Sequence, residues 1–385
     1  MKIYLTRVNA FRPRQWAGVS RYATCMTRAI HQVAPDVEFC AAHFSLHGRL
    51  PDERAALKRE FGIELVPVRW PDLSGINGYN ELLDRWLVPR VIQRAGAQIA
   101  WGTNCSVPSD RRRGFRSVVT IHDLFLLQLP ELAAPEFRRH TLRQARSVAR
   151  DCDLILTDSE FSRRQIAEVL DVRLDRIVAT YLAPAPSIVA ARDEDREQVL
   201  KELGLKAPLI LSVGTIEARK NYVRGLQAFA RLRAKYTEEV HWLIVGGRGW
   251  QAELVYAERE RLGLTDRVHV RHDISDSQLA ALYRACQCLF LPSPHEGFGL
   301  PAVEAMACDL PVVAARAGAL PEIVGDAAIL VSADCPDEMA HGLFRVITDP
   351  ALRADLVLRG RSRAGIFSWT DAASKVVEVF RKLIE

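Results

Sequence analysis

Two carboxylates, Glu296 and Glu304, stand eight positions apart in the segment HEGFGLPAVEAMACDLP, which runs from 295 to 311. The spacing predicts a glycine-containing loop followed by a short helix. Pro301 fits the first turn of that helix, where a backbone N–H would have no intrahelical partner in any case. With Glu304 in the first helical turn and Glu296 just before the loop, both carboxylates are expected to face one crevice.

The loop between the two glutamates has the features of a ligand site. Gly297 and Gly299 allow the backbone to approach a ligand closely. Free N–H groups and the positive end of the helix dipole suit a phosphate or a sugar hydroxyl. Acceptor carboxylates beside an anion-binding helix end therefore favour a ligand such as a nucleotide sugar. The alternative is that both glutamates only offset the helix N-terminus, where an acidic residue gains about 0.3–1 kcal/mol.

Adjacent cations follow another predicted strand. The strand over 208–213 leads into GTIEARKN at 214–221, where Arg219 and Lys220 precede a predicted helix. Two cations at a helix start are unfavourable against the helix dipole. They make sense if they face an anion such as a leaving diphosphate, with lysine as a point charge and arginine as a planar fork. Ordinary surface charge is the alternative.

Three more polar sets lie where predicted strands end. The strand over 241–245 leads to GGRGW at 246–250, which forms either a flat surface against a ligand or a simple turn. His122, after the strand over 117–121, either donates a hydrogen bond into the crevice or is a satisfied core histidine. The loop that contains Gly18 either covers a phosphate or acceptor or is an ordinary connector. Asp158 or Ser159 is interpreted as a helix N-cap.

Composition is that of an ordinary globular protein: 385 residues, 49% hydrophobic and 26% charged. This length predicts two to three domains. No apolar run approaches the roughly 18 residues needed to span a bilayer, and the N-terminus lacks a signal-peptide pattern. We therefore expect a cytoplasmic protein. Eight cysteines without metal-ligand spacing are interpreted as reduced, mostly buried thiols, and no metal site is expected.

Charge is uneven along the chain. Residues 1–183 hold 27 Lys and Arg against 20 Asp and Glu, whereas the remainder holds 25 against 27. The basic excess lies mainly in two arginine groups, the first at Arg111, Arg112, Arg113 and Arg116, the second at Arg138, Arg139, Arg143, Arg146 and Arg150. A basic half suggests an anionic partner, such as a membrane surface or a lipid phosphate. No nucleic-acid motif is present, so nucleic acid is not an expected partner. A solvated charged face is the alternative.

Apolar, β-branched runs alternate with helical patterns, which predicts an α/β protein with parallel sheets covered by helices on both faces. The predicted strands lie near 2–7, 37–44, 63–69, 97–101, 117–121, 153–157, 208–213, 241–245, 267–270, 287–291, 311–314 and 328–330. The predicted helices lie near 20–33, 51–60, 78–95, 136–149, 160–170, 221–235, 250–262, 276–284, 301–307, 336–347, 351–364 and 370–385. Two similar series predict two doubly wound domains, joined through 181–207. Such sheets bind ligands at the carboxyl ends of their strands.

Together these motifs resemble glycosyltransferase family 4. The matching segments are EGFGLPAVEAMA at 296–307, GTIEARKN, VGGRGW, HDL at 122–124, DSEFS at 158–162, LPEIVGDAAILV at 320–331 and FSW at 367–369. The resemblance implies the GT-B fold, with two Rossmann-like domains facing a central cleft. It implies an acceptor-binding domain over 1–183, a nucleotide-sugar-binding domain over 184–365 and a C-terminal helix over 366–385 that crosses back to the first domain.

The resemblance also implies roles for individual residues. Glu304 would bind the donor ribose, Glu296 the hydroxyls of the transferred sugar, and Arg219 and Lys220 the diphosphate. His122 would lie near the sugar. The implied donor-contacting residues are Gly18, Gly214, Thr215, Gly246, Arg248, Ile274 (within 271–275, which would border the base), Gly297, Phe298, Gly299 and Leu300.

Two positions depart from the family pattern. Thr215 stands where many members carry arginine, which shifts the burden of charge to Arg219 and Lys220. Asp309 replaces the usual glycine after the helix. If that position is left-handed, aspartate should cost up to about 1 kcal/mol relative to glycine.

The branch most resembled is that of bacterial mannosyltransferases of polysaccharide and lipopolysaccharide O-antigen synthesis. It implies a retaining, metal-independent glycosyltransferase that needs no cofactor beyond its co-substrate. The enzyme would move a hexose, in the first instance mannose from GDP-mannose, to a sugar hydroxyl of a glycan or lipid-linked oligosaccharide. Contact with anionic lipid would place it at the inner face of the plasma membrane. The alternatives are a UDP-sugar-using transferase, a nucleotide-sugar hydrolase or epimerase, and a non-catalytic sugar-nucleotide-binding protein. A nicotinamide dehydrogenase is disfavoured because no G-x-G-x-x-G follows a strand.

Overall fold

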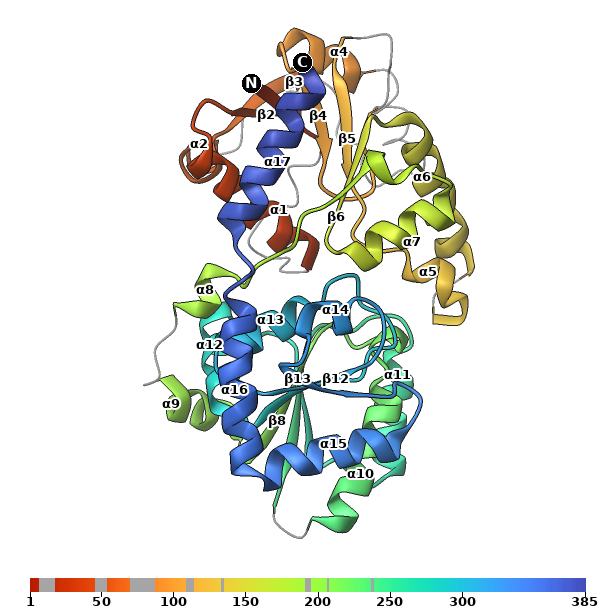
Figure 1. The fold of residues 1–385 in the computed structure, drawn as a ribbon, viewed down its shortest axis with the longest axis vertical. Coiled ribbons are helices and arrows are strands. Elements are labelled where there is room, and N and C mark those ends of the chain that lie inside the picture. Colours follow the sequence, from red (N-terminus) through yellow and green to blue (C-terminus); the bar gives the residue numbers. More distant parts are fainter. Residues whose placement is uncertain are drawn as a thin grey trace. The chain divides into compact units, whose positions relative to one another are not determined.

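Both halves of the chain form parallel sheets flanked by helices in a computed structural model (Figure 1). The structure describes residues 1–6, 18–45, 54–69, 87–108, 114–132, 135–190, 195–205, 208–236 and 239–385. The start of the helix expected over 78–95, the first residues of the one expected over 51–60, and the run Arg111–Arg113 lie outside these ranges.

The first sheet has seven strands. Their order is β3 (Ile63–Arg69), β2 (Glu38–Ser45), β1 (Lys2–Leu5), β4 (Ile99–Gly102), β5 (Arg116–Thr120), β6 (Leu154–Thr157) and β7 (Ile177–Ala179). Every neighbouring pair is parallel. The helices in this half of the fold are α1 (Gly18–Val33), α2 (Arg54–Phe61), α4 (Val88–Arg94), α5 (Phe125–Gln128), α6 (Pro135–Asp151), α7 (Glu160–Leu170) and α17 (Trp369–Ile384).

The second sheet has six parallel strands. Their order is β10 (Val268–Arg271), β9 (His241–Val245), β8 (Leu209–Val213), β11 (Cys288–Leu291), β12 (Val312–Ala315) and β13 (Ala328–Val331). The helices are α8 (Pro186–Val189), α9 (Asp195–Glu202), α10 (Tyr222–Lys235), α11 (Ala252–Arg261), α12 (Asp276–Ala285), α13 (Leu300–Ala307), α14 (Leu320–Val324), α15 (Pro336–Thr348) and α16 (Pro350–Ala364).

In each sheet the strand order reverses once, between β1 and β4 and between β8 and β11. Doubly wound sheets place their ligand crevice at such a reversal, outside the carboxyl ends of the strands. All twelve predicted strands are present. The apolar pattern of the sequence does not indicate β7 or the short helices α5, α8, α9 and α14, because segments this short show too few periods of such a pattern.

The chain divides into two compact units. Unit 1 comprises Met1–Leu127, Glu136–Leu182 and Trp369–Glu385, and unit 2 comprises Gln128–Pro135 and Ala183–Ser368. The assignment of Gln128–Pro135 to unit 2 departs from the domain limits inferred from the sequence. Nothing in the local sequence indicates it, because the assignment depends on contacts with residues far along the chain.

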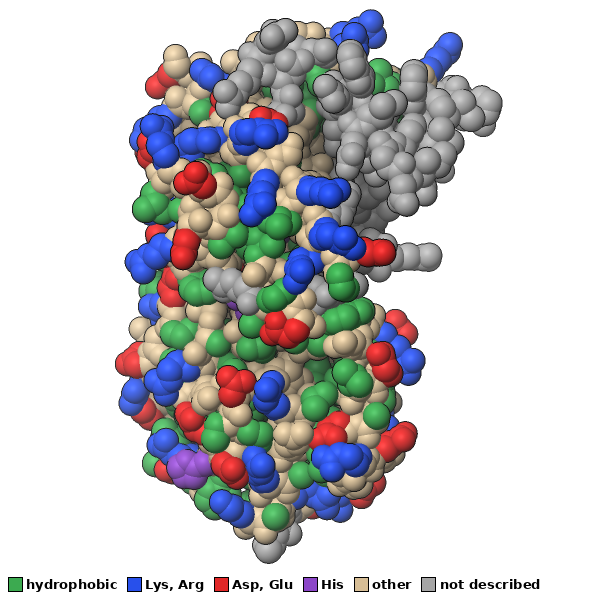
Figure 2. All heavy atoms as spheres, turned by 90° about the vertical axis from the view of Figure 1, so that its right-hand side faces the viewer, with side chains coloured by type: hydrophobic (Ala, Val, Ile, Leu, Met, Phe, Trp, Pro, Cys, Tyr) green, Lys and Arg blue, Asp and Glu red, His purple; other side chains and the backbone are tan. Residues whose placement is uncertain are grey.

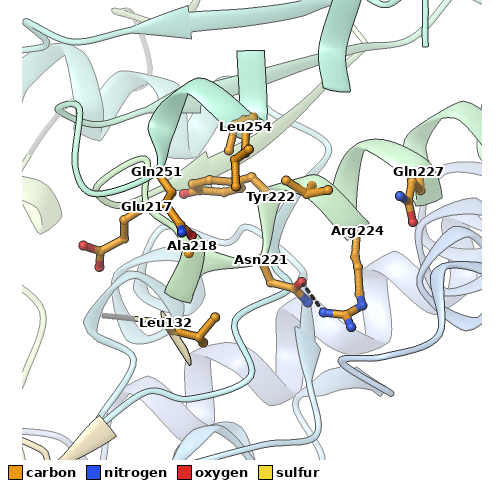
Figure 3. A pocket seen from close by; sticks show the side chains of 11 residues that line it. Leu132, Glu217, Ala218, Asn221, Tyr222, Arg224, Gln227, Gln251 and Leu254 are labelled. Atoms are coloured by element: carbon orange, nitrogen blue, oxygen red, sulfur yellow. Dashed lines mark hydrogen bonds between the residues drawn. The ribbon is translucent and has the colours of Figure 1, made fainter. Parts of the chain in front are cut away.

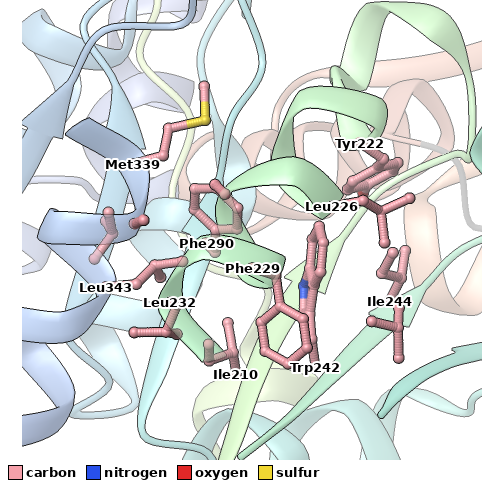
Figure 4. Packing of buried hydrophobic residues seen from close by; sticks show 14 of the residues in the cluster. Ile210, Tyr222, Leu226, Phe229, Leu232, Trp242, Ile244, Phe290, Met339 and Leu343 are labelled. Carbon is pink, nitrogen blue, oxygen red and sulfur yellow. The ribbon is translucent and has the colours of Figure 1, made fainter. Parts of the chain in front are cut away.

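The core of unit 2 fixes helix α10, which follows the loop that carries the two cations. Trp242 on β9 is fully buried, and its indole nitrogen donates a hydrogen bond to Ser212 Oγ at 3.0 Å (Figure 4). A Cβ at Gly225 would lie 2.8 Å from the Trp242 ring, so only glycine lets α10 pack this closely on the sheet. Burying a large apolar side chain stabilises by roughly 1.5–3 kcal/mol. The start of α10 is therefore held firmly over the end of β8.

Helix α17, the last helix of the chain, packs in unit 1. Phe380 is fully buried and lies edge-on to Trp101, with ring centroids 5.6 Å apart. Lys375 Nζ donates a hydrogen bond to the Ala179 carbonyl at 2.8 Å, and Arg381 pairs with Asp36. Unit 1 is therefore completed by residues from the far end of the sequence.

Asp309 adopts the left-handed conformation, with φ of 61°. This confirms the condition under which aspartate at this position lowers the stability of the fold relative to glycine. Arg361 on α16 binds both oxygens of the Asp309 carboxylate, one of them at 2.7 Å. The hydrogen bonds of Arg361 lower the pKa of Asp309. The side chain that strains the backbone thus also ties the end of α13 to α16.

All eight cysteines fall within the described ranges and carry thiols rather than disulfides, as predicted. Six of them are buried. Among the helices that the structure describes, none combines the length and the apolar character needed to cross a bilayer.

Candidate functional site

A cluster of four alternating charges lies where the strand order of unit 2 reverses. Lys220, after β8, places its Nζ 2.6 Å from Oε1 of Glu296, after β11. Arg219 places Nη1 3.4 Å from the other oxygen of Glu296 and Nη2 2.9 Å from Glu217. Lys220 and Glu296 are each only 7% exposed. The sequence thus brings both predicted cations and one predicted carboxylate to one point.

The loop after β8 needs unusual backbone geometry to turn Lys220 inward. Gly214 has φ of 150°, and a Cβ there would lie 2.9 Å from Lys220 Cε. Asn221 has φ of 57°, a conformation that asparagine tolerates better than most residues. Its side-chain amide donates to the carbonyls of Pro292 and Ala333 at 2.9 and 2.8 Å. These bonds tie the β8 loop to the loops after β11 and β13.

A glycine outside the predicted motif fixes the backbone of Glu296. Gly318, after β12, has φ of 60°, and a Cβ there would lie 2.6 Å from the Glu296 nitrogen. The neighbouring Ala319 donates its N–H to the Glu296 carbonyl at 2.9 Å. Any larger residue at position 318 would displace the carboxylate.

The electrostatics of the cluster follow from burial and pairing. Burial alone would raise the pKa of Glu296, but the charges of Lys220 and Arg219, with hydrogen bonds from Lys220 and Ser293, lower it to about 2. Burial lowers the pKa of Lys220, and the charge of Glu296 opposes that change. The carboxylate is therefore ionised at neutral pH and depends on its cations for that charge.

Glu304 is 2% exposed, and its Oε2 accepts a hydrogen bond from the Tyr283 hydroxyl at 2.9 Å. Helix α13 begins at Leu300, with Gly299 as N-cap at φ of 93°. Glu304 is thus the fifth helical residue, and its predicted place in the first turn is wrong by one position. Since Glu296 pairs with Lys220 and Glu304 lies beyond the first turn, neither carboxylate acts only to offset the helix dipole.

The residues between Glu296 and helix α13 differ in how deeply they are packed. Gly297 and Phe298 are buried, and the Phe298 ring packs edge-on to Phe367 at 5.6 Å. Leu300 is half-buried. Phe298 therefore anchors the loop, and Gly299 is required because a Cβ there would lie 2.7 Å from Leu320 Cδ2.

The remaining candidates of unit 2 lie along the ends of β8, β9 and β10. Thr215 is exposed, and Ile274 is half-buried. A Cβ at Gly246 would lie 2.0 Å from the Gly214 carbonyl oxygen, so glycine is required for the strand ends to meet. The Arg248 guanidinium stacks over the Tyr256 ring at 4.7 Å. The start of the loop GGRGW is therefore packed against the end of β8, whereas Gly247, Arg248 and Trp250 are exposed.

Unit 1 carries the two other candidates. Among the described residues, none lies within 4 Å of a Cβ placed at Gly18, the exposed first residue of α1, so packing against that part of unit 1 does not demand glycine there. His122, after β5, contacts Asp158 through Nδ1 at 2.8 Å and the Thr103 carbonyl through Nε2 at 3.1 Å. Both ring nitrogens thus face protein acceptors, which favours the satisfied histidine over one that donates into a crevice.

Sequence reasoning missed four contributors to these sites. Ser159, not Asp158, caps α7 and accepts from the Ser162 N–H at 3.0 Å, which leaves Asp158 for His122. Glu217 lies in the segment GTIEARKN, but the sequence suggested no role for it. Tyr283 lies in a predicted helix, and its position there does not set it apart from its neighbours. Nothing in the sequence distinguishes Gly318 from the other glycines. Asp158, Tyr283 and Gly318 act through contacts distant in sequence, which local spacing cannot reveal. Glu217 pairs with Arg219, its near neighbour in the sequence.

An open cavity of about 380 Å³ lies beside the charged cluster within unit 2 (Figure 3). Its polar lining includes Glu217, Asn221 and Gln251, and its apolar lining includes Tyr222 and Leu254. The volume falls within the roughly 300–1,000 Å³ typical of small-molecule sites. Glu217 belongs to the charged cluster through its ion pair with Arg219, and it also lines the cavity. A ligand in the cavity would therefore lie against the cluster.

Comparison with known proteins gives a consistent result. Residues 192–363 match the family model "Glycosyl transferases group 1". The O-antigen chain mannosyltransferase B of Escherichia coli is 31% identical over 70% of this chain and 71% of its own length. The MMP alpha-(1->4)-mannosyltransferase of Mycolicibacterium hassiacum is 32% identical over 95% of both. The solved structure of sucrose-phosphate synthase from Thermosynechococcus elongatus matches with a TM-score of 0.78 at 21% identity, over 99% of this chain and 98% of that one.

The lowered pKa of Glu296 makes a prediction about stability. A carboxylate whose pKa is about 2 when folded and about 4.5 when unfolded stabilises the fold above pH 4.5. That contribution is lost as pH falls toward 2. We expect Glu296→Gln to lower the free energy of unfolding at pH 6 and to differ much less from the parent near pH 3, as measured by urea denaturation.

Glu338→Gln is the matched control, because Glu338 is exposed on α15 and lies outside the cluster. A stability difference between Glu296→Gln and the parent that is the same at both pH values would contradict an ionised Glu296 held by its cations.

Proposed function

This chain belongs to the group 1 glycosyltransferases, and we propose that it transfers mannose from GDP-mannose to a sugar hydroxyl of a glycan or lipid-linked oligosaccharide. The observation that carries the proposal is the charged cluster at the strand reversal of unit 2, in which the buried Lys220 and Glu296 pair and Arg219 bridges Glu296 to Glu217. The choice of mannose is supported by two relatives named as mannosyltransferases.

The two cations are proposed to bind the donor diphosphate. Breaking the bond to the anomeric carbon leaves negative charge on the diphosphate, and preorganised donors that stabilise such charge are usually the largest electrostatic contribution to catalysis. Lys220 Nζ carries three N–H donors, of which Glu296 Oε1 accepts one. With two cations supplying positive charge, we propose that transfer needs no divalent metal and no cofactor other than the co-substrate.

The two carboxylates are proposed to bind hydroxyls. An ionised carboxylate accepts hydrogen bonds through two oxygens, which suits the vicinal hydroxyls of a sugar. We assign Glu304 to the donor ribose and Glu296 to the transferred sugar. Transfer is proposed to proceed with retention by front-face attack, in which the leaving phosphate oxygen accepts the proton of the attacking hydroxyl.

Helix α6 of unit 1 supports a proposed contact with anionic lipid. Arg139, Arg143, Arg146 and Arg150 are exposed and spaced by four, three and four residues, which places them on one side of the helix. Ala145 and Ala149 are buried on another side. Figure 2 shows Lys and Arg side chains gathered over the visible face of unit 1. Like charges at this spacing destabilise a helix by about 0.2–0.5 kcal/mol per pair, a cost that an anionic surface would reverse.

The first prediction of the proposed function concerns the donor nucleotide. In a thermal-unfolding panel of GDP, UDP, ADP and TDP at equal concentration, GDP alone should raise the unfolding temperature. A ligand specific for the folded state stabilises by about 2.7 kcal/mol at a hundredfold excess over its Kd. Glu304→Gln should abolish the GDP shift, whereas Tyr283→Phe, which keeps the carboxylate, should retain most of it. A shift with UDP instead would overturn the donor assignment, and no shift with any nucleotide would count against the proposed site.

A second prediction concerns the cations. Lys220→Met should lower kcat for mannosyl transfer from GDP-mannose by roughly 10²–10³-fold, the loss typical for one such donor. Because this change leaves the buried Glu296 carboxylate without its lysine partner, the double variant Lys220→Met with Glu296→Gln serves as a folded comparison. Arg231→Met, which removes a half-exposed cation from α10, the helix that follows Lys220, is the control. Transfer that survives in both Lys220 variants, or that EDTA abolishes in the parent, would contradict the proposed chemistry.

A third prediction concerns α6. Charge reversal at Arg139, Arg143 and Arg146 should greatly weaken sedimentation with phosphatidylglycerol vesicles, because each basic residue near an anionic surface contributes about 1 kcal/mol. Replacing the same three residues by lysine should preserve binding. Equal binding of the reversed variant, or equal binding of the parent to phosphatidylcholine vesicles, would exclude this surface. Arg138 is left unchanged because it is half-buried.

A further inference from the structure

His122 and Asp158 form a buried pair at the carboxyl ends of β5 and β6. Nδ1 of His122 lies 2.8 Å from Oδ2 of Asp158, and the two side chains are 16% and 5% exposed. On the other side of the ring, Nε2 lies 3.1 Å from the Thr103 carbonyl oxygen. A carbonyl oxygen only accepts, so Nε2 must carry a proton.

The contact at Nδ1 decides the charge of the ring. If Nδ1 had no proton, its lone pair would face the Asp158 carboxylate at 2.8 Å, and two acceptors would repel each other at that distance. With a proton on Nδ1, the same contact becomes a charge-assisted hydrogen bond. The geometry therefore favours a doubly protonated imidazolium over either neutral tautomer.

The surroundings hold this charge in place. The Tyr22 ring stands edge-on to His122 with centroids 4.9 Å apart, and the burial of Tyr22 raises the pKa of its hydroxyl, so Tyr22 stays neutral. Asp123 also acts on the charge of the pair, and its Oδ1 accepts a hydrogen bond from the Phe125 N–H. Burial alone would lower the pKa of His122, but the Asp158 charge and hydrogen bond raise it overall.

Asp158 in turn depends on His122. Its second oxygen, Oδ1, is buried and has no hydrogen-bond partner within the described part of the chain. A buried carboxylate with one oxygen unpaired is costly unless a cation compensates it. Burial raises the pKa of Asp158, while the charge and the hydrogen bond of His122 oppose that rise. Each side chain therefore stabilises the charged form of the other.

We propose that Asp158 is a positioning residue that keeps His122 doubly protonated and oriented at neutral pH, so that His122 serves the transferase as a fixed cation and not as a general base. This inference rests on the proposed function for its catalytic consequence. It predicts that transfer falls as pH rises through the pKa of His122, because the cation and its orientation are then lost together.

The direct test uses the unaltered protein. In a ¹⁵N-histidine-labelled sample, with the His122 signal assigned by its absence in His122→Asn, both ring nitrogens should show the chemical shifts of protonated nitrogen at pH 7.5. A single neutral tautomer at that pH would overturn the proposal without the use of any Asp158 variant.

The variant test separates positioning from folding. Asp158→Asn keeps the shape but removes the charge, and should lower the pKa of His122 by about one to three pH units. The alkaline limb of the pH–rate profile should move down by the same amount. Asp123→Asn, which removes a neighbouring carboxylate that does not touch the ring, should move both much less. A His122 pKa that shifts without the alkaline limb would overturn the catalytic role of the pair.

The outcomes distinguish this inference from the function on which it rests. A chain that turns over no nucleotide sugar would overturn the proposed function. A fully active enzyme in which His122 titrates at its ordinary pKa in both the parent and Asp158→Asn would overturn this inference alone.

Discussion

The structure of unit 2 around its candidate site depends on keeping one buried carboxylate ionised. Glu296 is almost without solvent, and a buried charge deprived of its partner costs about 3–5 kcal/mol. Lys220 and Arg219 provide the compensation, so the loops after β8 and β11 must meet at atomic distance. The left-handed Asn221 and the missing side chains of Gly214 and Gly318 are conditions for that meeting.

Unit 1 also contains a buried pair of opposite charges, formed by different groups. Its sheet also brings a cation and a carboxylate together after neighbouring strands, as His122 and Asp158. The pair in unit 2 consists of groups whose charges persist over a wide pH range, whereas imidazole titrates near neutrality unless a neighbour holds its proton. In unit 2 the carboxylate and the ammonium group keep their charges by pairing with each other, whereas in unit 1 the imidazole keeps its proton through its contact with Asp158.

Much of this architecture follows from the sequence. The alternation of apolar runs and helical patterns predicts every strand of the described residues except β7. The motifs also single out Glu296, Arg219 and Lys220, which meet where the strand order of unit 2 reverses. What the sequence does not reveal is pairing. The adjacency of Arg219 and Lys220 indicates an anion, but only the fold shows that Glu296 and Glu217 already face them. Likewise, Asp158 and Ser159 are equivalent as caps until β5 brings His122 alongside one of them.

The division of the chain into units has a consequence for protein engineering. The backbone passes from one unit to the other after Leu127, Pro135, Leu182 and Ser368. A single cut therefore cannot release either unit intact: cleavage at Leu182 would leave unit 1 without α17 and its Phe380, and unit 2 without the segment that carries Leu132 to the cavity. Chimeras that exchange substrate preference between relatives must graft discontinuous segments, and the boundary suggested by the linker alone would yield two incomplete folds.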